Sequence, residues 1–171
     1  MSAGLSPYTI PLTAPSPIFD YRPYRETDAA IGWNASYTES TAWPIVPVNS
    51  SLPYIDALPK GVAYRRTHLN GAAVSLSFEG TGFYMCFTAS GASYSVTVDG
   101  RAIDSSSSNS AAGSPCEKSG AETIFQADDL TLGTHEAVLT LSSAPLDDFR
   151  FYGGGFTVAV NTKGQRQYHY R

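Results

Sequence analysis

Short runs in which apolar and polar residues alternate recur along the chain, and this alternation limits the possible folds more than any other feature. In the run GFYMCFT (82–88), every second residue from Phe83 onward is a large apolar one. The run SYSVTVD (93–99) repeats the pattern and ends in an Asp-Gly turn signal. Successive side chains of a strand point to opposite faces, so these runs predict half-buried antiparallel strands, which we interpret as a hairpin.

Similar runs recur from residue 17 to residue 160, and no segment has a convincing helical period. One of them, AAIGWNASYT, predicts a strand with Ile31, Trp33 and Ala35 on one face. The composition fits, because only 15% of the 171 residues are charged, against roughly 25% in typical soluble domains. Eight to ten short strands without helices predict an all-β fold, an antiparallel two-sheet β-sandwich of the jelly-roll kind.

The length predicts one domain. We expect residues 1–16 to form an extended lead-in, residues 17–160 the β-sandwich, and residues 161–171 a C-terminal tail.

The formal net charge of -4 argues against nucleic acid as a partner, because proteins that bind nucleic acid usually carry a patch of basic residues. No apolar run approaches the roughly 18 residues of a membrane-spanning helix, so we expect no membrane insertion by this chain. The sequence sets no oligomeric state.

The two cysteines help to indicate whether the protein is extracellular or intracellular. Cys86 lies in an alternating run and Cys116 in a serine-rich connection, and a disulfide between them would close a long loop. The alternative is two free thiols.

The segments Asn34-Ala35-Ser36 and Asn49-Ser50-Ser51 are N-glycosylation sequons. The first residues show no secretion signal, so the chain is either intracellular or a mature fragment. The disulfide and the sequons favour an extracellular protein.

The segment 38–60 carries four prolines and no sustained period, which predicts a long ordered loop, and such loops are usually functional. Sugar binding needs an aromatic ring for the apolar face of a pyranose and planar polar groups for its hydroxyls. Both kinds of group gather around this loop. The predicted carbohydrate-binding residues are Trp43, Tyr54, Tyr64, Arg65 and Arg66. The alternative is that Trp43 packs the loop onto the sandwich.

No catalytic motif is present, and the three histidines are interpreted as structural or surface residues: His68, His135 and His169. Asp128 and Asp129 are interpreted as turn residues, and Asp147 or Asp148 as a partner of loop amides. No cofactor is predicted, although a structural Ca²⁺ is possible, with Asp20 or Glu26 as candidate ligands.

The order of motifs resembles a series in fungal secreted and membrane-anchored proteins. The segments GAAVSLSFEGTGFYMCF, ASYSVTVDG, LTLGTHEAVLTL and PLDDFRFYGG carry this resemblance, and FDYRPYRETDAAIGWNASY is similar to the opening of basidiomycete cell-surface ectodomains. The segments are similar to the galactose-binding-domain-like jelly roll, the fold of many carbohydrate-binding modules. The resemblance covers most of residues 17–160 and implies a fungal, extracellular or cell-surface protein.

Three functional hypotheses follow. The first is a non-catalytic, lectin-like domain that binds a carbohydrate or glycoconjugate. The second is a structural or adhesion ectodomain with a protein partner and no sugar site. The third is a small polysaccharide-active enzyme, which a cleft holding His68 or His135 against a carboxylate would favour.

Overall fold

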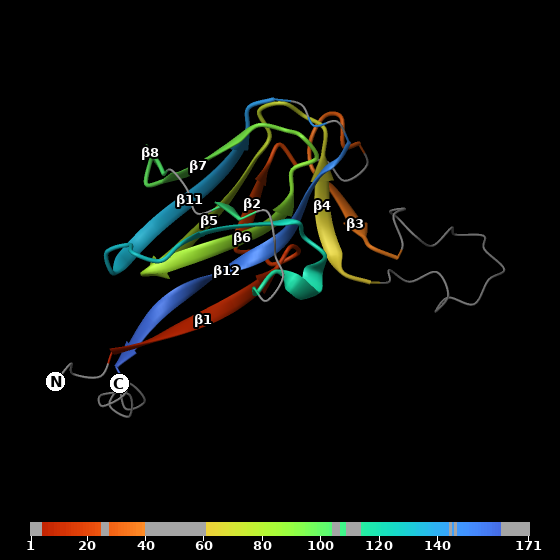
Figure 1. Cartoon of the computed structure of the whole chain (residues 1–171). Coiled ribbons are helices and arrows are strands. Elements are labelled where there is room, and N and C mark those ends of the chain that lie inside the picture. The colour runs from red at the N-terminus through yellow and green to blue at the C-terminus, as the bar shows by residue number, and fades with distance from the viewer. Residues whose placement is uncertain are drawn as a thin grey trace.

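Two antiparallel β-sheets pack face to face in the computed structural model (Figure 1), which describes residues 5–24, 28–39, 61–103, 107–108, 114–143, 145 and 147–161. The five-stranded sheet has the order β2-β5-β11-β7-β8, with the bounds Phe19–Arg22, Ala73–Gly80, Gly133–Leu141, Tyr94–Val98 and Arg101–Ala102. The predicted two-sheet antiparallel β-sandwich is confirmed.

The other sheet has seven strands and runs β3-β4-β12-β6-β10-β9, with β1 as a further partner of β12. Its strands have the bounds Asn34–Tyr37 (β3), Ala63–Thr67 (β4), Phe149–Asn161 (β12), Gly82–Thr88 (β6), Thr123–Ala127 (β10), Ser107–Ser108 (β9) and Leu5–Thr13 (β1). A short 3-10 helix, η2 (Glu117–Ser119), lies between β9 and β10. No helix among the described residues is long and apolar enough to cross a membrane.

The core between the sheets is rich in aromatic rings. Trp33 is completely buried, and its indole N–H donates to the Ala73 carbonyl at 2.9 Å. Phe149 stands edge-on to Trp33 and stacks on Phe87. Aromatic pairs of this kind add to the free energy gained from burying their surface. The prediction that Trp33 is a core residue is confirmed.

The strand β6 corrects two predictions. It is buried on both faces and not on one, because a second cluster covers its outer face. That cluster comprises Tyr64, Tyr84, Cys86, Cys116, Ala121, Ile124 and Tyr152. The expected hairpin of β6 with β7 is also absent, since β6 pairs with β12 and β10 while β7 pairs with β11 and β8. The connection around Ser90 therefore crosses from one sheet to the other.

The run 29–37 is a strand only from Asn34 onward. Ile31 lies in the preceding bend and is 52% exposed, so it does not share a face with Trp33 as predicted. Backbone hydrogen bonds explain the bend, because the His68 N–H donates to the Ala29 carbonyl at 2.8 Å and draws the segment toward the end of β4.

Most of the predicted lead-in, from Leu5 to Thr13, is part of the sheet as strand β1. All nine residues of β1 pair with β12, from Leu5 opposite Asn161 to Thr13 opposite Gly153. The two strands leave the body as a two-stranded ribbon (Figure 1). Pro7 and Pro11 have no N–H to offer a further strand, and prolines at such positions discourage edge-to-edge pairing.

Candidate functional site

The candidate site lies at a fork in the seven-stranded sheet, called the long sheet below. β4 and β1 pair one after the other with the same edge of β12, since Arg65 lies opposite Phe151 and Thr13 lies opposite Gly153. Between those two pairings the register of β12 with β6 shifts at Tyr152. A bulge of this kind re-aims side chains, and bulges are common beside functional sites.

A groove opens at this fork on the outer face of the long sheet, with a volume of about 590 Å³. Pockets that hold small ligands commonly have volumes of about 300–1,000 Å³. The lining comes from five separate parts of the chain: Pro11, Leu12, Thr13, Pro15, Gly61, Val62, Ala63, Tyr84, Cys86, Pro115, Lys118, Ser119, Tyr152 and Gly154.

Two tyrosines line the groove while remaining largely buried, which fixes their orientation. A Cβ on Gly155 would lie 2.6 Å from Cε1 of Tyr84, so glycine is required for the Tyr84 ring to cross β12 here. Burial raises the pKa of the Tyr84 hydroxyl. Burial also raises the pKa of Tyr152, against the hydrogen bond from Arg150, which lowers it. Both hydroxyls are therefore neutral at physiological pH and can donate as well as accept hydrogen bonds.

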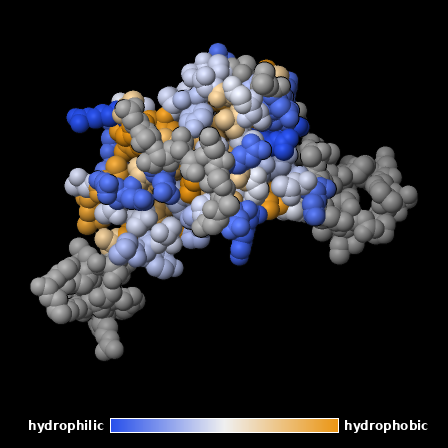
Figure 2. Space-filling view, in the orientation of Figure 1, coloured by the Kyte–Doolittle hydropathy of each residue, from blue (hydrophilic) through white to orange (hydrophobic). Residues whose placement is uncertain are grey.

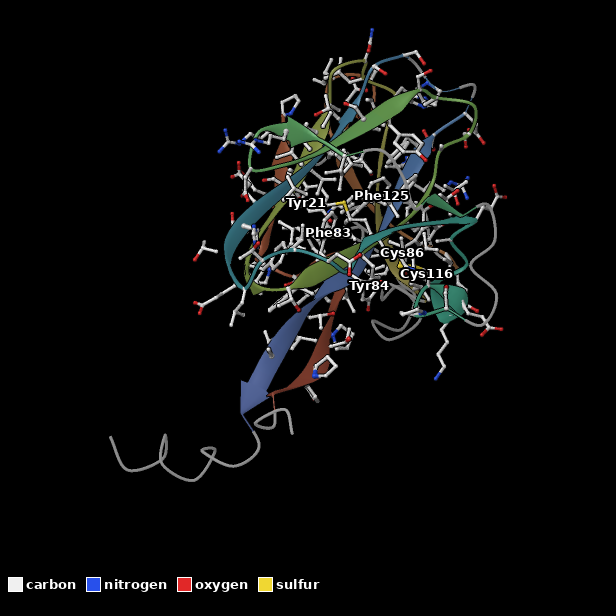
Figure 3. The ribbon with its side chains drawn as sticks, turned by 60° about the vertical axis from the view of Figure 1, so that its left-hand side comes forward. Tyr21, Phe83, Tyr84, Cys86, Cys116 and Phe125 are labelled. Atoms are coloured by element: carbon white, nitrogen blue, oxygen red, sulfur yellow. A yellow bond between two sulfur atoms is a disulfide. The ribbon has the colours of Figure 1, made fainter. Side chains whose placement is uncertain are left out.

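A disulfide between Cys86 and Cys116 anchors one wall of the groove, which confirms the predicted pair. Figure 3 shows Tyr84, Cys86 and Cys116 beside the short helix, away from Phe83 and Phe125 in the core. The helix η2 follows Cys116 directly and places Lys118 and Ser119 at the groove. The Ser119 hydroxyl donates to the Cys116 carbonyl at 2.6 Å, which ties the helix to the disulfide.

The structure separates the predicted carbohydrate-binding residues. Trp43 and Tyr54 lie outside the described residues. Tyr64 is 3% exposed, and its ring packs 5.3 Å from that of Tyr152, so it supports the groove from behind. Arg65 points to the other side of the sheet, where its guanidinium lies 5.6 Å from the centre of the Tyr21 ring. Arg66 lies on the outer face.

Of the two sequons, Asn49 lies outside the described residues and Asn34 opens β3. The Asn34 side chain is 5% exposed and lies within hydrogen-bond distance of the Ser36 hydroxyl, at 3.4 Å. The Asn34 side chain therefore presents little surface to which a glycan could be attached in the folded domain.

Asp148 lies between the side chains of Arg66 and His68 at the end of the sandwich. Its carboxylate accepts a hydrogen bond from Arg66 at 3.0 Å and also contacts the imidazole of His68. The interpretation of Asp148 as a partner of loop amides is therefore replaced by an ion pair, although its own backbone carbonyl does accept from the Ser90 hydroxyl at 3.0 Å. Neither His68 nor Asp148 lines the groove.

His135 also contacts a carboxylate, but both of its ring nitrogens are engaged. Nδ1 lies 2.7 Å from the Asp99 carboxylate, and Nε2 contacts the Thr131 carbonyl. Both partners can accept hydrogen bonds, so this geometry favours the imidazolium form, which donates from both nitrogens. The hydrogen bond to Asp99 accordingly raises the pKa of His135 and lowers that of Asp99. This arrangement supports a structural role and leaves no nitrogen free for proton transfer.

We expect this pair to make stability depend on pH. Because the pKa of His135 is raised, its contribution is complete below its unfolded pKa of about 6.5 and is lost as the pH rises through the folded pKa. Urea unfolding of the wild type and of His135→Gln at about pH 6 and about pH 9 measures this. The free energy of unfolding of the wild type should exceed that of the variant by more at about pH 6 than at about pH 9. An equal difference at both values would contradict the charged pair.

No group of three or more histidine, cysteine or acidic side chains among the described residues could hold a metal ion. Of the two candidate Ca²⁺ ligands, Glu26 lies outside the described residues. Asp20 accepts a hydrogen bond from Arg22 at 2.7 Å.

Comparison with protein families, curated proteins and solved structures returns no match for this chain. The resemblance to fungal ectodomains therefore remains a prediction. The groove residues Tyr84, Tyr152 and Lys118 were not predicted as site residues. The available signals were the three consecutive glycines 153–155 and the tyrosine on the supposedly polar face of β6.

Proposed function

We propose that this protein is a non-catalytic, extracellular carbohydrate-binding domain, and that the groove at the sheet fork is its binding site. The observation that carries the proposal is the lining of the groove, which combines apolar side chains with polar groups and with two buried, oriented tyrosines, Tyr84 and Tyr152. Sugars need this combination, because a pyranose has an apolar face of C–H groups and a rim of hydroxyls.

The walls of the groove supply both kinds of contact. Leu12, Pro15 and Val62 offer apolar surface, while Lys118 and Ser119 offer polar groups. The disulfide supports an extracellular location, since such bonds persist mainly in oxidising compartments. A fungal cell surface or wall, with its polysaccharides, fits the resemblance of the sequence.

The test is a glycan and polysaccharide array, run with and without Ca²⁺, on the wild type and on Val62→Trp. Val62 is 38% exposed and lines the groove, so an indole there fills the site at little cost to folding. We expect the wild type to bind and the variant to lose at least about tenfold in affinity, which corresponds to about 1.4 kcal/mol. Unchanged binding by a folded Val62→Trp would place the sugar site elsewhere.

A second candidate is a domain that binds a protein partner. Figure 2 shows hydrophobic residues gathered at the surface near β11, and Leu132, in the connection before that strand, is 54% exposed. Clustered exposed apolar residues are typical of protein interfaces. Leu132→Ser would weaken such an interface and leave sugar binding unchanged, so the two candidates are separable.

A further inference from the structure

The outer face of the long sheet carries a row of polar and aromatic side chains beyond the groove. Tyr64 and Arg66 lie two apart on β4, and Arg150 lies directly opposite Arg66 on β12. Residues two apart on a strand share a face, so the row continues from the groove toward the end of the sandwich. Beyond Arg66 the row ends at His68, whose side chain is half-exposed.

Arg150 connects this row to the groove. Its guanidinium lies 5.6 Å from the centre of the Tyr64 ring and interacts with the Tyr152 side chain, which lines the groove. The side chain nevertheless remains 38% exposed. These two contacts hold the guanidinium in place with part of it open to solvent.

The two arginines form an unusual cross-strand pair, since like charges directly opposite each other destabilise a sheet. Arg66 is compensated by the buried Asp148. Arg150 has a weaker partner, because Asp147 lies 3.9 Å away and is 71% exposed. A guanidinium has five donors, so Arg150 has N–H groups that these contacts do not use. Such planar, oriented donors suit the hydroxyl groups of a sugar.

The row is long. From Val62 at the groove to His68, six residues along the chain span roughly 20 Å. A single pyranose ring is much shorter than this path. We propose that the groove is one end of an extended site for a linear oligosaccharide, which continues along β4 and β12 over Arg150 toward Arg66. This inference rests on the proposed carbohydrate binding and makes Arg150 a residue that selects for chain length.

The experiment is calorimetric titration of the folded full chain with glucan, chitin, mannan and xylan oligosaccharides, each from the monosaccharide up to the hexasaccharide. In the series that binds, affinity should rise at least about tenfold between the monosaccharide and the tetrasaccharide, as expected for an added hydrogen bond to a charged group. Arg150→Gln should remove most of this rise, so the ratio of the tetrasaccharide affinity to the affinity for the shortest ligand that binds should fall toward one in the variant.

Two further variants control this result. Arg101→Gln removes an exposed arginine from β8 in the other sheet and should leave every affinity unchanged. Arg66→Lys keeps a cation beside the buried Asp148 but removes the planar donors, and it should reduce affinity only for the longer ligands. Equal affinity for monosaccharide and tetrasaccharide overturns the extended site while carbohydrate binding stands. Failure of every series to bind overturns the proposed function and the extended site with it.

Discussion

Replacement of both cysteines, in the double variant Cys86→Ala/Cys116→Ala, is expected to lower the free energy of unfolding by about 3.5 kcal/mol. The bond joins residues 30 positions apart, and a loop of that length restricts the unfolded chain considerably. The folded state also loses contacts, because Cys116 is completely buried and Cys86 nearly so. Urea unfolding followed by tyrosine and tryptophan fluorescence measures the change.

The same variant should lose ligand binding even where it remains folded. The disulfide at Cys116 attaches the η2 wall to strand β6. Without the bond, only local hydrogen bonds such as that of Ser119 keep η2 in position. The reduced wild type is the matched control, since it keeps both sulfur atoms and lacks only the bond. A loss below about 1 kcal/mol in both proteins would show that packing alone holds this wall.

Gly153→Ala is expected to lower the free energy of unfolding by at least about 2 kcal/mol. Gly153 has a φ of +106°, which L side chains rarely adopt, and a Cβ there would lie 2.4 Å from the Leu12 carbonyl oxygen. The strain and the collision both act where β1 joins β12, so the fork should open and the groove should lose its shape. Thermal and urea unfolding, together with the glycan array, measure both effects.

Two other glycines separate the causes. Gly100 has a φ of +81° with no atom within 4 Å of an added Cβ, so Gly100→Ala introduces strain without a collision. Gly133 also has open space around it and has no positive φ, so Gly133→Ala should change stability by less than about 0.5 kcal/mol. The prediction requires the order Gly153, Gly100, Gly133 in decreasing loss of stability, and any other order refutes it.

The local parts of the fold could be predicted because each depends on a few neighbouring residues. The turn at Asp99 and Gly100 was expected from that pair, and both residues have positive φ in the structure. The disulfide was a sound prediction for a related reason, since a long serine-rich connection beside a strand is a place where a cross-link stabilises the fold.

The partners of each strand could not be predicted. The alternation of apolar and polar residues predicts that a strand has an apolar face. It does not predict which other strand pairs with that strand. The run 82–88 therefore seemed to form a hairpin with the next run, whereas the two belong to different sheets. Its second face seemed open to water, and only the cluster around Cys116 shows that it is covered.

The sequence by itself determined that this protein is built of short antiparallel strands in two sheets, because strand periodicity and turn residues are local properties of the chain. Only the tertiary structure decided where a ligand can bind. The groove draws on β1, β4, β6, β12 and the η2 segment, which are far apart along the chain. It exists because β1 and β4 share one edge of β12 and diverge at Tyr152, a relation set by long-range pairing.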